Sequence, residues 1–123
     1  LVIQYFSYSK FKDKLVLELV TSSNDFREFF ERFKIDFFTQ NISPLDLSFN
    51  SKKLEKDTLK QDKRYLKIKI RRGEFIDVLV NRKPWEDLSI GFQCKVYRNP
   101  NIYNSNFWFH FTNIYISNNV PKF

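Results

Sequence analysis

The chain has 123 residues, of which 42% are hydrophobic and 19% aromatic, and its formal net charge is +7. This length fits one domain, residues 1–123, with one continuous core, and no apolar run approaches the ~20 residues of a membrane-spanning helix, so we expect no membrane partner. Cys94 is the only cysteine, which excludes an intrachain disulfide and favours a reducing, intracellular location.

The first third of the chain predicts two strands and one helix. Residues 1–8 and 15–21 are rich in β-branched, aromatic and long apolar side chains, so we expect both to be strands. Residues 25–37 predict the single helix, because five Phe recur at helical spacing and form one apolar stripe that would pack against a sheet. Asp25 and Glu28 have the spacing of a capping box at its start. The stripe consists of Phe26, Phe29, Phe30, Phe33 and Phe37.

The middle of the chain is polar and rich in lysine. Residues 45–49 are expected to form a short strand after Pro44. Residues 50–63 fit either a flexible loop or a short helix, because Leu54 and Leu59 alone give little periodicity.

The second half of the chain predicts four more strands. Residues 65–72 alternate strictly between apolar and polar side chains, and residues 74–81 follow a glycine that suits a tight reversal. Residues 89–98 and 106–117 are expected to form a pair of long strands, joined by the turn-forming segment 99–105.

These elements favour a mainly β fold with one α-helix, within the α+β class. A strongly curved antiparallel sheet that closes into a small barrel would bury the pattern and leave no open edges. We therefore expect an OB-like (oligonucleotide-binding type) small antiparallel barrel. A sandwich of two sheets fits the same elements and stays open as an alternative.

The positive charge is concentrated in one segment. Residues 51–72 contain ten lysines and arginines and three acids, an excess of +7 that equals the excess of the whole chain. Such a concentration creates a local field that attracts phosphate groups. The alternative is a basic segment that is simply solvated.

The strand expected at residues 65–72 combines these charges with a ring. Its alternation turns Leu66, Ile68 and Ile70 toward the core. Its opposite face would present cations about 7 Å apart, twice the rise per residue of a strand, beside a ring able to stack on a base, as in single-strand binders. A lysine-protected edge strand is the alternative. The outward residues are Tyr65, Lys67, Lys69 and Arg71.

The last two expected strands add rings and cations. If residues 89–98 and 106–117 pair, Tyr97 and Trp108 form a two-ring platform beside Lys95 and Arg98, unless Trp108 is buried in the core. The candidate nucleic-acid-binding residues are therefore Lys60, Lys63, Arg64, Tyr65, Lys67, Lys69, Arg71, Lys95, Tyr97, Arg98, Tyr103, Trp108 and His110.

Residues typical of catalysis are scarce. His110 is the only histidine, so a zinc site with three or four suitable ligands is not supported. Gly73 and Gly91 are the only glycines, and no phosphate-binding loop or dinucleotide fingerprint can be formed from them. We expect no enzymatic activity, no metal and no cofactor.

One segment resembles a known family. Residues 60–70, Lys-Gln-Asp-Lys-Arg-Tyr-Leu-Lys-Ile-Lys-Ile, are similar to a stretch of poxvirus-type single-stranded DNA-binding proteins, where a loop rich in Lys, Gln and Asp likewise precedes an aromatic-Leu-Lys-Ile-Lys strand. Residues 96–98 and 107–116 resemble the late paired strands of that family, and together these parts cover about a third of the chain. The resemblance implies sequence-tolerant coating of single strands during genome replication.

We therefore expect a sequence-tolerant single-stranded DNA-binding protein of viral genome replication, located in the nucleus or at a cytoplasmic replication site. Its partner would be single-stranded nucleic acid, DNA in preference to RNA, with a homo-oligomer or a replication-complex partner in addition. One alternative is an OB-type protein-interaction subunit of a replication or telomere complex, in which the Phe-rich helix docks a partner. The other is RNA binding, which the same charges and rings permit.

Overall fold

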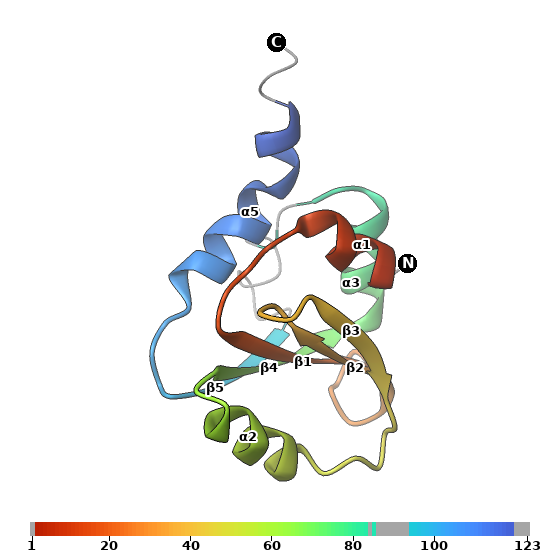
Figure 1. The fold of residues 1–123 in the computed structure, drawn as a ribbon. Helices are drawn as coiled ribbons and strands as arrows, with labels where there is room; N and C mark the ends of the chain where they lie inside the picture. The colour runs from red at the N-terminus through yellow and green to blue at the C-terminus, as the bar shows by residue number, and fades with distance from the viewer. Residues whose placement is uncertain (1, 84, 86–93, 120–123) are drawn as a thin grey trace.

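The computed structural model describes residues 2–83, 85 and 94–119, with side chains described as far as residue 112. Within this part, five strands form one open, mixed sheet in the order β3-β2-β1-β4-β5, accompanied by four helices (Figure 1). In chain order the elements are α1 (Val2–Ser9), β1 (Leu15–Ser22), β2 (Phe29–Asp36), β3 (Asn41–Leu45), α2 (Ser51–Lys60), β4 (Arg64–Arg71), α3 (Arg72–Val80), β5 (Cys94–Asn99) and α5 (Ser105–Asn119).

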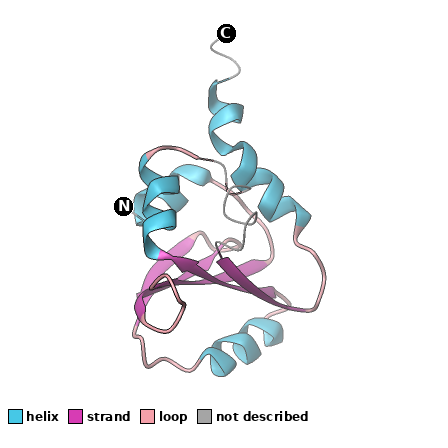
Figure 2. Ribbon diagram, turned by 180° about the vertical axis from the view of Figure 1, so that it is seen from behind, coloured by secondary structure: helices cyan, strands magenta, loops and turns pink. Residues whose placement is uncertain are grey.

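The sheet lies between two layers of helices. Helices α1, α3 and α5 cover one face, and α2 lies on the other, as Figures 1 and 2 show from opposite sides. Strand β1 pairs with β4 in parallel, which requires a crossover; the other strand pairs are antiparallel. The α+β class is therefore confirmed, whereas the sheet is open and does not form the closed OB-like barrel that we expected.

The core lies between the sheet and the three-helix layer. Alternate residues of the two central strands point into it, and all are fully buried: Leu15, Leu17 and Leu19 of β1, and Leu66, Ile68 and Ile70 of β4. On the helix side a cluster of rings closes the core, in edge-to-face, tilted and stacked pairs with centroids 4.9–6.3 Å apart. The cluster comprises Tyr5, Phe6, Phe11, Phe37, Trp85, Phe107 and Phe111.

Two predicted strands are confirmed. Residues 15–21 lie in β1 and residues 65–71 in β4, with the predicted inward set of β4 buried. Strand β5 confirms residues 94–98 of the strand predicted at 89–98; residues 89–93 of that prediction lie outside the described residues. For residues 50–63 the helical alternative is correct over Ser51–Lys60, where the Asn50 side chain caps the helix by accepting the Lys52 amide hydrogen bond.

The predicted Phe-rich helix at residues 25–37 is wrong, because this segment contains a loop and strand β2. Pairing with β1 explains the difference, because Leu17 lies opposite Ile35 and Leu19 opposite Phe33. Every second residue of this segment therefore faces the core, as in a strand, and the helical stripe is not formed. Phe29 and Phe30 are exposed as a result. The short strand expected at 45–49 is also displaced, since β3 covers Asn41–Leu45.

Three segments predicted as strands, residues 1–8, 74–81 and 106–117, are helical instead over residues 2–8, 74–80 and 106–117. In each, the buried side chains recur at helical spacing and meet the ring cluster. The buried sets are Tyr5, Phe6 and Ser9 in α1, Phe75, Val78 and Leu79 in α3, and Phe107, Trp108 and Phe111 in α5. Packing of aromatic faces has overridden the strand propensity of these residues.

Helix α5 provides a direct test of this arrangement. Phe111 is fully buried, whereas Phe109, two residues away, is 73% exposed. We expect Phe111→Ala to lower the free energy of unfolding by about 3–5 kcal/mol, because the truncation removes ring contacts and leaves a cavity. The matched control Phe109→Ala should change it by no more than about 0.5 kcal/mol. Urea unfolding followed by circular dichroism measures both, and equal losses would contradict the helical packing of α5.

Candidate functional site

The face of the sheet that carries α2 is only partly covered. Helix α2 packs on this face through Leu54 and Thr58, both buried. Because residues directly opposite each other in a strand pair share a face, the pairs Lys67–Tyr97 and Lys69–Lys95 place their side chains here. We call the part of this face beyond α2 the open face (Figure 2).

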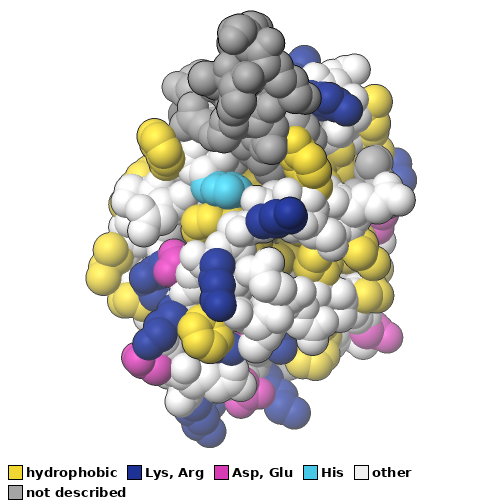
Figure 3. Space-filling view, turned by 45° about the horizontal axis from the view of Figure 1, so that its top comes forward, with side chains coloured by type: hydrophobic (Ala, Val, Ile, Leu, Met, Phe, Trp, Pro, Cys, Tyr) yellow, Lys and Arg dark blue, Asp and Glu magenta, His cyan; other side chains and the backbone are white. Residues whose placement is uncertain are grey.

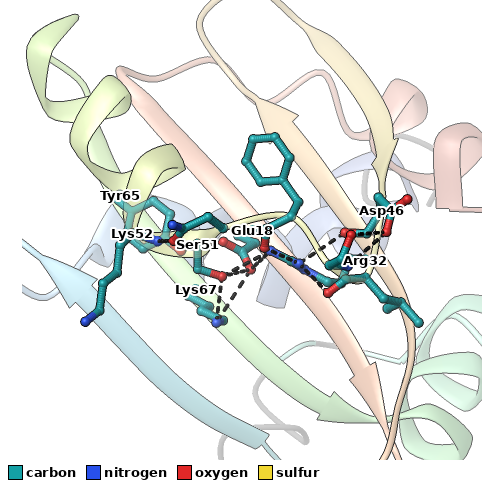
Figure 4. A network of polar contacts seen from close by, with 11 residues as sticks. Glu18, Arg32, Asp46, Ser51, Lys52, Tyr65 and Lys67 are labelled. Atoms are coloured by element: carbon teal, nitrogen blue, oxygen red, sulfur yellow. Dashed lines mark hydrogen bonds and ion pairs between the residues drawn. The ribbon is translucent and has the colours of Figure 1, made fainter.

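A buried carboxylate lies at the centre of this face. Glu18 of β1 has no exposed surface, and its oxygens accept three hydrogen bonds (Figure 4). Tyr65 Oη donates to Oε1 at 2.6 Å, while Arg32 Nη2 and Ser51 Oγ each donate to Oε2 at 2.8 Å. The ammonium group of Lys67 lies 3.6 Å from Oε2. Strands β1, β2 and β4 and helix α2 therefore meet at one carboxylate.

The environment of Glu18 keeps it ionised. Burial by itself raises the pKa of the carboxyl, but hydrogen bonds from Tyr65 and Ser51 and the charges of Lys67 and Arg32 outweigh burial, so the pKa of Glu18 lies below its ordinary value. Burial and the hydrogen bond to Glu18 raise the pKa of the Tyr65 hydroxyl, so that group stays protonated and donates.

A cluster of three lysines lies beside this network. Lys67 and Lys69 follow each other on β4, and Lys95 lies opposite Lys69 on β5; we call these the lysine cluster. Burial and then repulsion from its two neighbours lower the pKa of Lys69. Its Nζ lies 5.2 Å from the centroid of the Phe29 ring. The cluster is thus a concentration of positive charge that an incoming anion would relieve.

A second ring reaches the far end of the cluster. The loop between β1 and β2 places Phe26 in a left-handed backbone conformation, with φ of 62°, which is uncommon for an aromatic residue. The Phe26 ring centroid lies 4.8 Å from Arg71 Cζ and 4.9 Å from Lys95 Nζ. Arg71 Nε also donates to the Asn24 carbonyl at 2.8 Å, which holds the loop over the sheet.

The open face contains a cavity of about 200 Å³. Its lining consists of four apolar side chains, two of which are aromatic rings, together with three cationic side chains and one hydroxyl group. We call it the sheet cavity. It is lined by Val20, Phe29, Arg32, Leu47, Phe49, Ser51, Lys67 and Lys69.

The structure brings together five of the predicted binding residues and separates the others. Five lie on or beside the open face: Lys67, Lys69, Arg71, Lys95 and Tyr97. Tyr97 is 49% exposed and donates to Glu55 of α2 at 2.6 Å. Tyr65 shares this face but is buried against Glu18. Its ring meets Tyr97 edge-on with centroids 6.0 Å apart.

The remaining candidates lie elsewhere. Lys63 is bonded to Asp36 at 2.7 Å, and Arg64 is paired with Asp13. Lys60 is exposed on α2, Tyr103 is exposed ahead of α5, and Arg98 Nε donates to Asn101 at 3.1 Å. His110 Nε2 lies 2.7 Å from the Ser9 carbonyl oxygen, within the helix layer.

The predicted platform of Tyr97 and Trp108 is not formed. Trp108 lies on α5 in the core, 5.1 Å from the ring of Phe107 and 6.4 Å from that of Trp85, on the other side of the sheet from Tyr97. The platform required residues 106–117 to be a strand, and this segment is helical. On the face that Figure 3 shows, basic side chains are scattered among hydrophobic and polar ones and do not gather into one patch.

Sequence reasoning missed Glu18, Arg32 and the rings of the sheet cavity. Glu18 is the one charged residue in the apolar run 15–20, and a charge inside a buried strand is rare unless it is paired. That signal could have marked Glu18. Its partners lie 14, 33, 47 and 49 residues away in the sequence, so nothing local pointed to Arg32, Ser51, Tyr65 or Lys67.

The described part of the chain contains neither a cluster of metal ligands nor a membrane-spanning helix. Among those residues, no three His, Cys, Asp or Glu side chains lie close enough to hold a metal ion. None of the helices described is both long and apolar enough to cross a membrane. Cys94 packs against the core, and burial raises the pKa of its thiol to about 11.

The chain is similar to proteins named cytidine monophosphate-N-acetylneuraminic acid hydroxylase. It is 33% identical over 111 residues to the protein of Macaca mulatta, covering 88% of this chain and 17% of that protein. It is equally similar to the Homo sapiens protein, named as inactive, of which it covers 20%. With the Danio rerio protein it shares 32% identity over 110 residues, 87% of this chain and 17% of that protein.

The chain thus spans about a fifth or less of the length of these curated relatives. No family model matches it. No solved structure matches it either.

The Glu18 network makes a prediction about stability and pH. Because the folded-state pKa of Glu18 lies below its ordinary value of 4.5, its ionisation stabilises the fold above that pH, and this contribution is lost as the pH falls through the folded-state pKa. We expect Glu18→Gln to be less stable than the wild type by about 3 kcal/mol at neutral pH, since Arg32 loses its buried partner.

Urea unfolding at neutral pH and at successively lower pH below 4.5 measures the difference, which should shrink on acidification. Glu31→Gln is the matched control, because Glu31 pairs with Arg72 near the surface, and such exposed pairs contribute about 0–1 kcal/mol. A difference between wild type and Glu18→Gln that stays constant with pH would contradict the assignment of an ionised Glu18.

Proposed function

We propose that this chain is a ligand-binding part of a protein related to the cytidine monophosphate-N-acetylneuraminic acid hydroxylases, and that its open face binds negative groups of the substrate. The relatives are similar over most of the chain, which covers a fifth or less of their length. A cytidine monophosphate derivative of an acidic sugar carries a phosphate, a carboxylate and a flat pyrimidine ring. Cations beside exposed rings suit all three groups.

The lysine cluster is the observation that carries this proposal. Its three ammonium groups share one face, and the pKa of Lys69 is lowered by burial and by repulsion from the other two. Of the three, Lys67 is held by Glu18 and by Ser51, whose Oγ accepts from Lys67 Nζ at 3.0 Å. An anion bound at Lys69 and Lys95 would relieve the repulsion, which makes this a favourable place for a phosphate or a carboxylate.

The size of the sheet cavity indicates how much of the ligand it would take. Pockets that enclose a whole small molecule usually measure about 300–1,000 Å³, and this cavity measures about 200 Å³. We propose that it accepts one portion of the ligand, a ring between the apolar walls, while the charged groups remain at the lysine cluster. The walls that would contact the ring include Phe29 and Phe49.

We further propose that this part of the protein binds and does not carry out hydroxylation. Oxygen chemistry generally depends on a metal or organic cofactor, and the described residues offer no group of three metal-ligating side chains. The oxidation step would then belong to residues of the protein other than those described.

A titration tests binding at the lysine cluster. We expect cytidine monophosphate and its N-acetylneuraminic acid conjugate to bind, and Lys69→Gln or Lys95→Gln each to weaken binding about tenfold, because a lost hydrogen bond to a charged group costs about 1.5 kcal/mol or more. Isothermal titration calorimetry measures the affinities. Lys56→Gln makes the same charge change on α2, outside the open face, and should have little effect. Absence of binding, or an equal loss in Lys56→Gln, would refute the proposal.

Single-stranded nucleic-acid binding is the second candidate function. The observation that favours it is the row of Lys67, Lys69 and Arg71 along one face of β4, as the sequence indicated, with the exposed ring of Tyr97 opposite Lys67 on β5. The resemblance to poxvirus-type single-stranded DNA-binding proteins stays a prediction on the same residues.

Salt dependence distinguishes this second function. If oligo-dT binds through three or four phosphate contacts, the logarithm of the affinity should fall against the logarithm of the salt concentration with a slope of about −2 to −3. Tyr97→Ala should cost ~1–3 kcal/mol of binding. Fluorescence anisotropy of a labelled oligonucleotide measures both, with RNA of matched sequence for comparison. Trp108→Ala is not a test of binding, because Trp108 lies in the core. A slope near zero would exclude this function.

A further inference from the structure

The loop between β3 and α2 is held in place by one buried arginine. Arg32 Nη1 donates to the carbonyl oxygens of Asp46, Leu47 and Phe49 at 3.1, 2.9 and 2.7 Å. Its Nη2 donates to Glu18 at 2.8 Å and to Ser51 Oγ at 3.0 Å (Figure 4). The planar guanidinium thus joins the centre of the sheet to three carbonyl oxygens of the loop backbone and to the start of α2.

This arrangement is unsuited to stability alone. Replacing a buried ion pair by apolar side chains is often neutral or stabilising, because both charges lose their hydration. Arg32 Nε is buried and has no hydrogen-bond partner among the described residues, which adds a further cost. What the pair provides instead is a fixed position for the loop, since Nη1 of the rigid guanidinium contacts the loop carbonyls while Nη2 is bonded to Glu18 and Ser51.

The loop that Arg32 holds forms a wall of the sheet cavity. Leu47 and Phe49 belong to this loop and line the cavity opposite the sheet residues Val20 and Lys69. Both loop side chains are more than a third exposed, so few contacts of their own fix them. The position of the wall therefore depends on the backbone beneath it, which Arg32 binds.

We infer that Arg32 and Glu18 are positioning residues for ligand binding in the sheet cavity. Arg32 fixes the wall formed by Leu47 and Phe49, and Glu18 orients Arg32. Through Ser51 and its own charge, Glu18 also keeps Lys67 turned toward the network. Lys69 and Lys95 are then left to meet the negative group of the ligand. This inference rests on the proposed function of the open face.

Ligand affinity should depend on the protonation state of Glu18. Among the described residues, Lys34 lies directly opposite Glu18 on β2, and Arg32 lies two residues along the same strand and face. The other groups that face Glu18 are Tyr65 and Lys67 of β4 and Ser51 of α2. When Glu18 is protonated, Arg32 loses its partner and the loop loses its anchor. Ligand affinity should therefore fall as the pH drops through the folded-state pKa of Glu18, and this acid decline should be absent from Glu18→Gln, which is weak at every pH.

The experiment uses cytidine monophosphate as the probe and a double-mutant cycle. Arg32→Lys keeps the charge but has one nitrogen where arginine uses two, Nη1 toward the loop carbonyls and Nη2 toward Glu18 and Ser51. Phe49→Ala truncates one side chain of the wall. We expect each single variant to bind about tenfold more weakly, as for a lost charged hydrogen bond, and the double variant to bind no more weakly than Phe49→Ala, because both act through one wall. Additive losses would overturn the inference.

Hydrogen exchange provides a test that needs no ligand. In Arg32→Lys the amides of residues 46–51 should exchange faster, while those of β2 and β4 keep their protection. Unchanged exchange in 46–51 would overturn the inference. If Arg32→Lys does not fold, Ser51→Ala removes one member of the same network with less disturbance and is measured in the same way. A wild type that binds no nucleotide would refute the proposed function, while the exchange result still decides whether Arg32 positions the loop.

Discussion

The structure depends on the burial of one carboxylate in the middle of a sheet. Strand β1 is buried along its whole length, and Glu18 stands among its apolar residues with no exposed surface. An uncompensated charge there would be very costly. The fold supplies hydrogen bonds from β2, β4 and α2. The parallel pairing of β1 with β4 and the crossover through α2 are what bring these groups to Glu18.

This compensation divides the sheet into two unlike faces. On the helix side, aromatic rings from α1 and α5, together with Trp85, close over the leucines and isoleucines of the central strands. On the α2 side, charge and hydroxyl groups fill the centre, and beyond α2 the lysine cluster is left beside a small cavity. On this face the buried carboxylates are already paired, Glu18 with Arg32 and Asp36 with Lys63, and the lysine cluster still leaves an excess of ammonium groups. That excess is the physical reason to look for an anionic ligand.

Two independent observations are compatible with an anionic ligand. One is the similarity to the hydroxylases, and the other is the geometry of the open face. The relatives are named for a substrate that contains a phosphate and an acid. The open face provides cations for such groups and exposed apolar rings next to them. Single-stranded nucleic acid has the same chemical components in a different order. The two proposed functions therefore depend on the same residues. They differ in the ligand, which is a single nucleotide derivative in one case and a long chain of repeated nucleotides in the other.

The sequence by itself determined the two central strands and the common direction of Lys67, Lys69 and Arg71, because strict alternation or an uninterrupted apolar run settles a strand within a few residues. It did not determine the two Phe-rich segments. Residues 25–37 have helical spacing yet contain β2, and residues 106–117 alternate yet form part of α5. Aromatic residues bury well in either conformation, and the partners that decided between them lie far along the chain. Only the tertiary structure brought Arg32, Ser51 and Lys67 to Glu18, because a buried charge finds its partners in space and not in sequence.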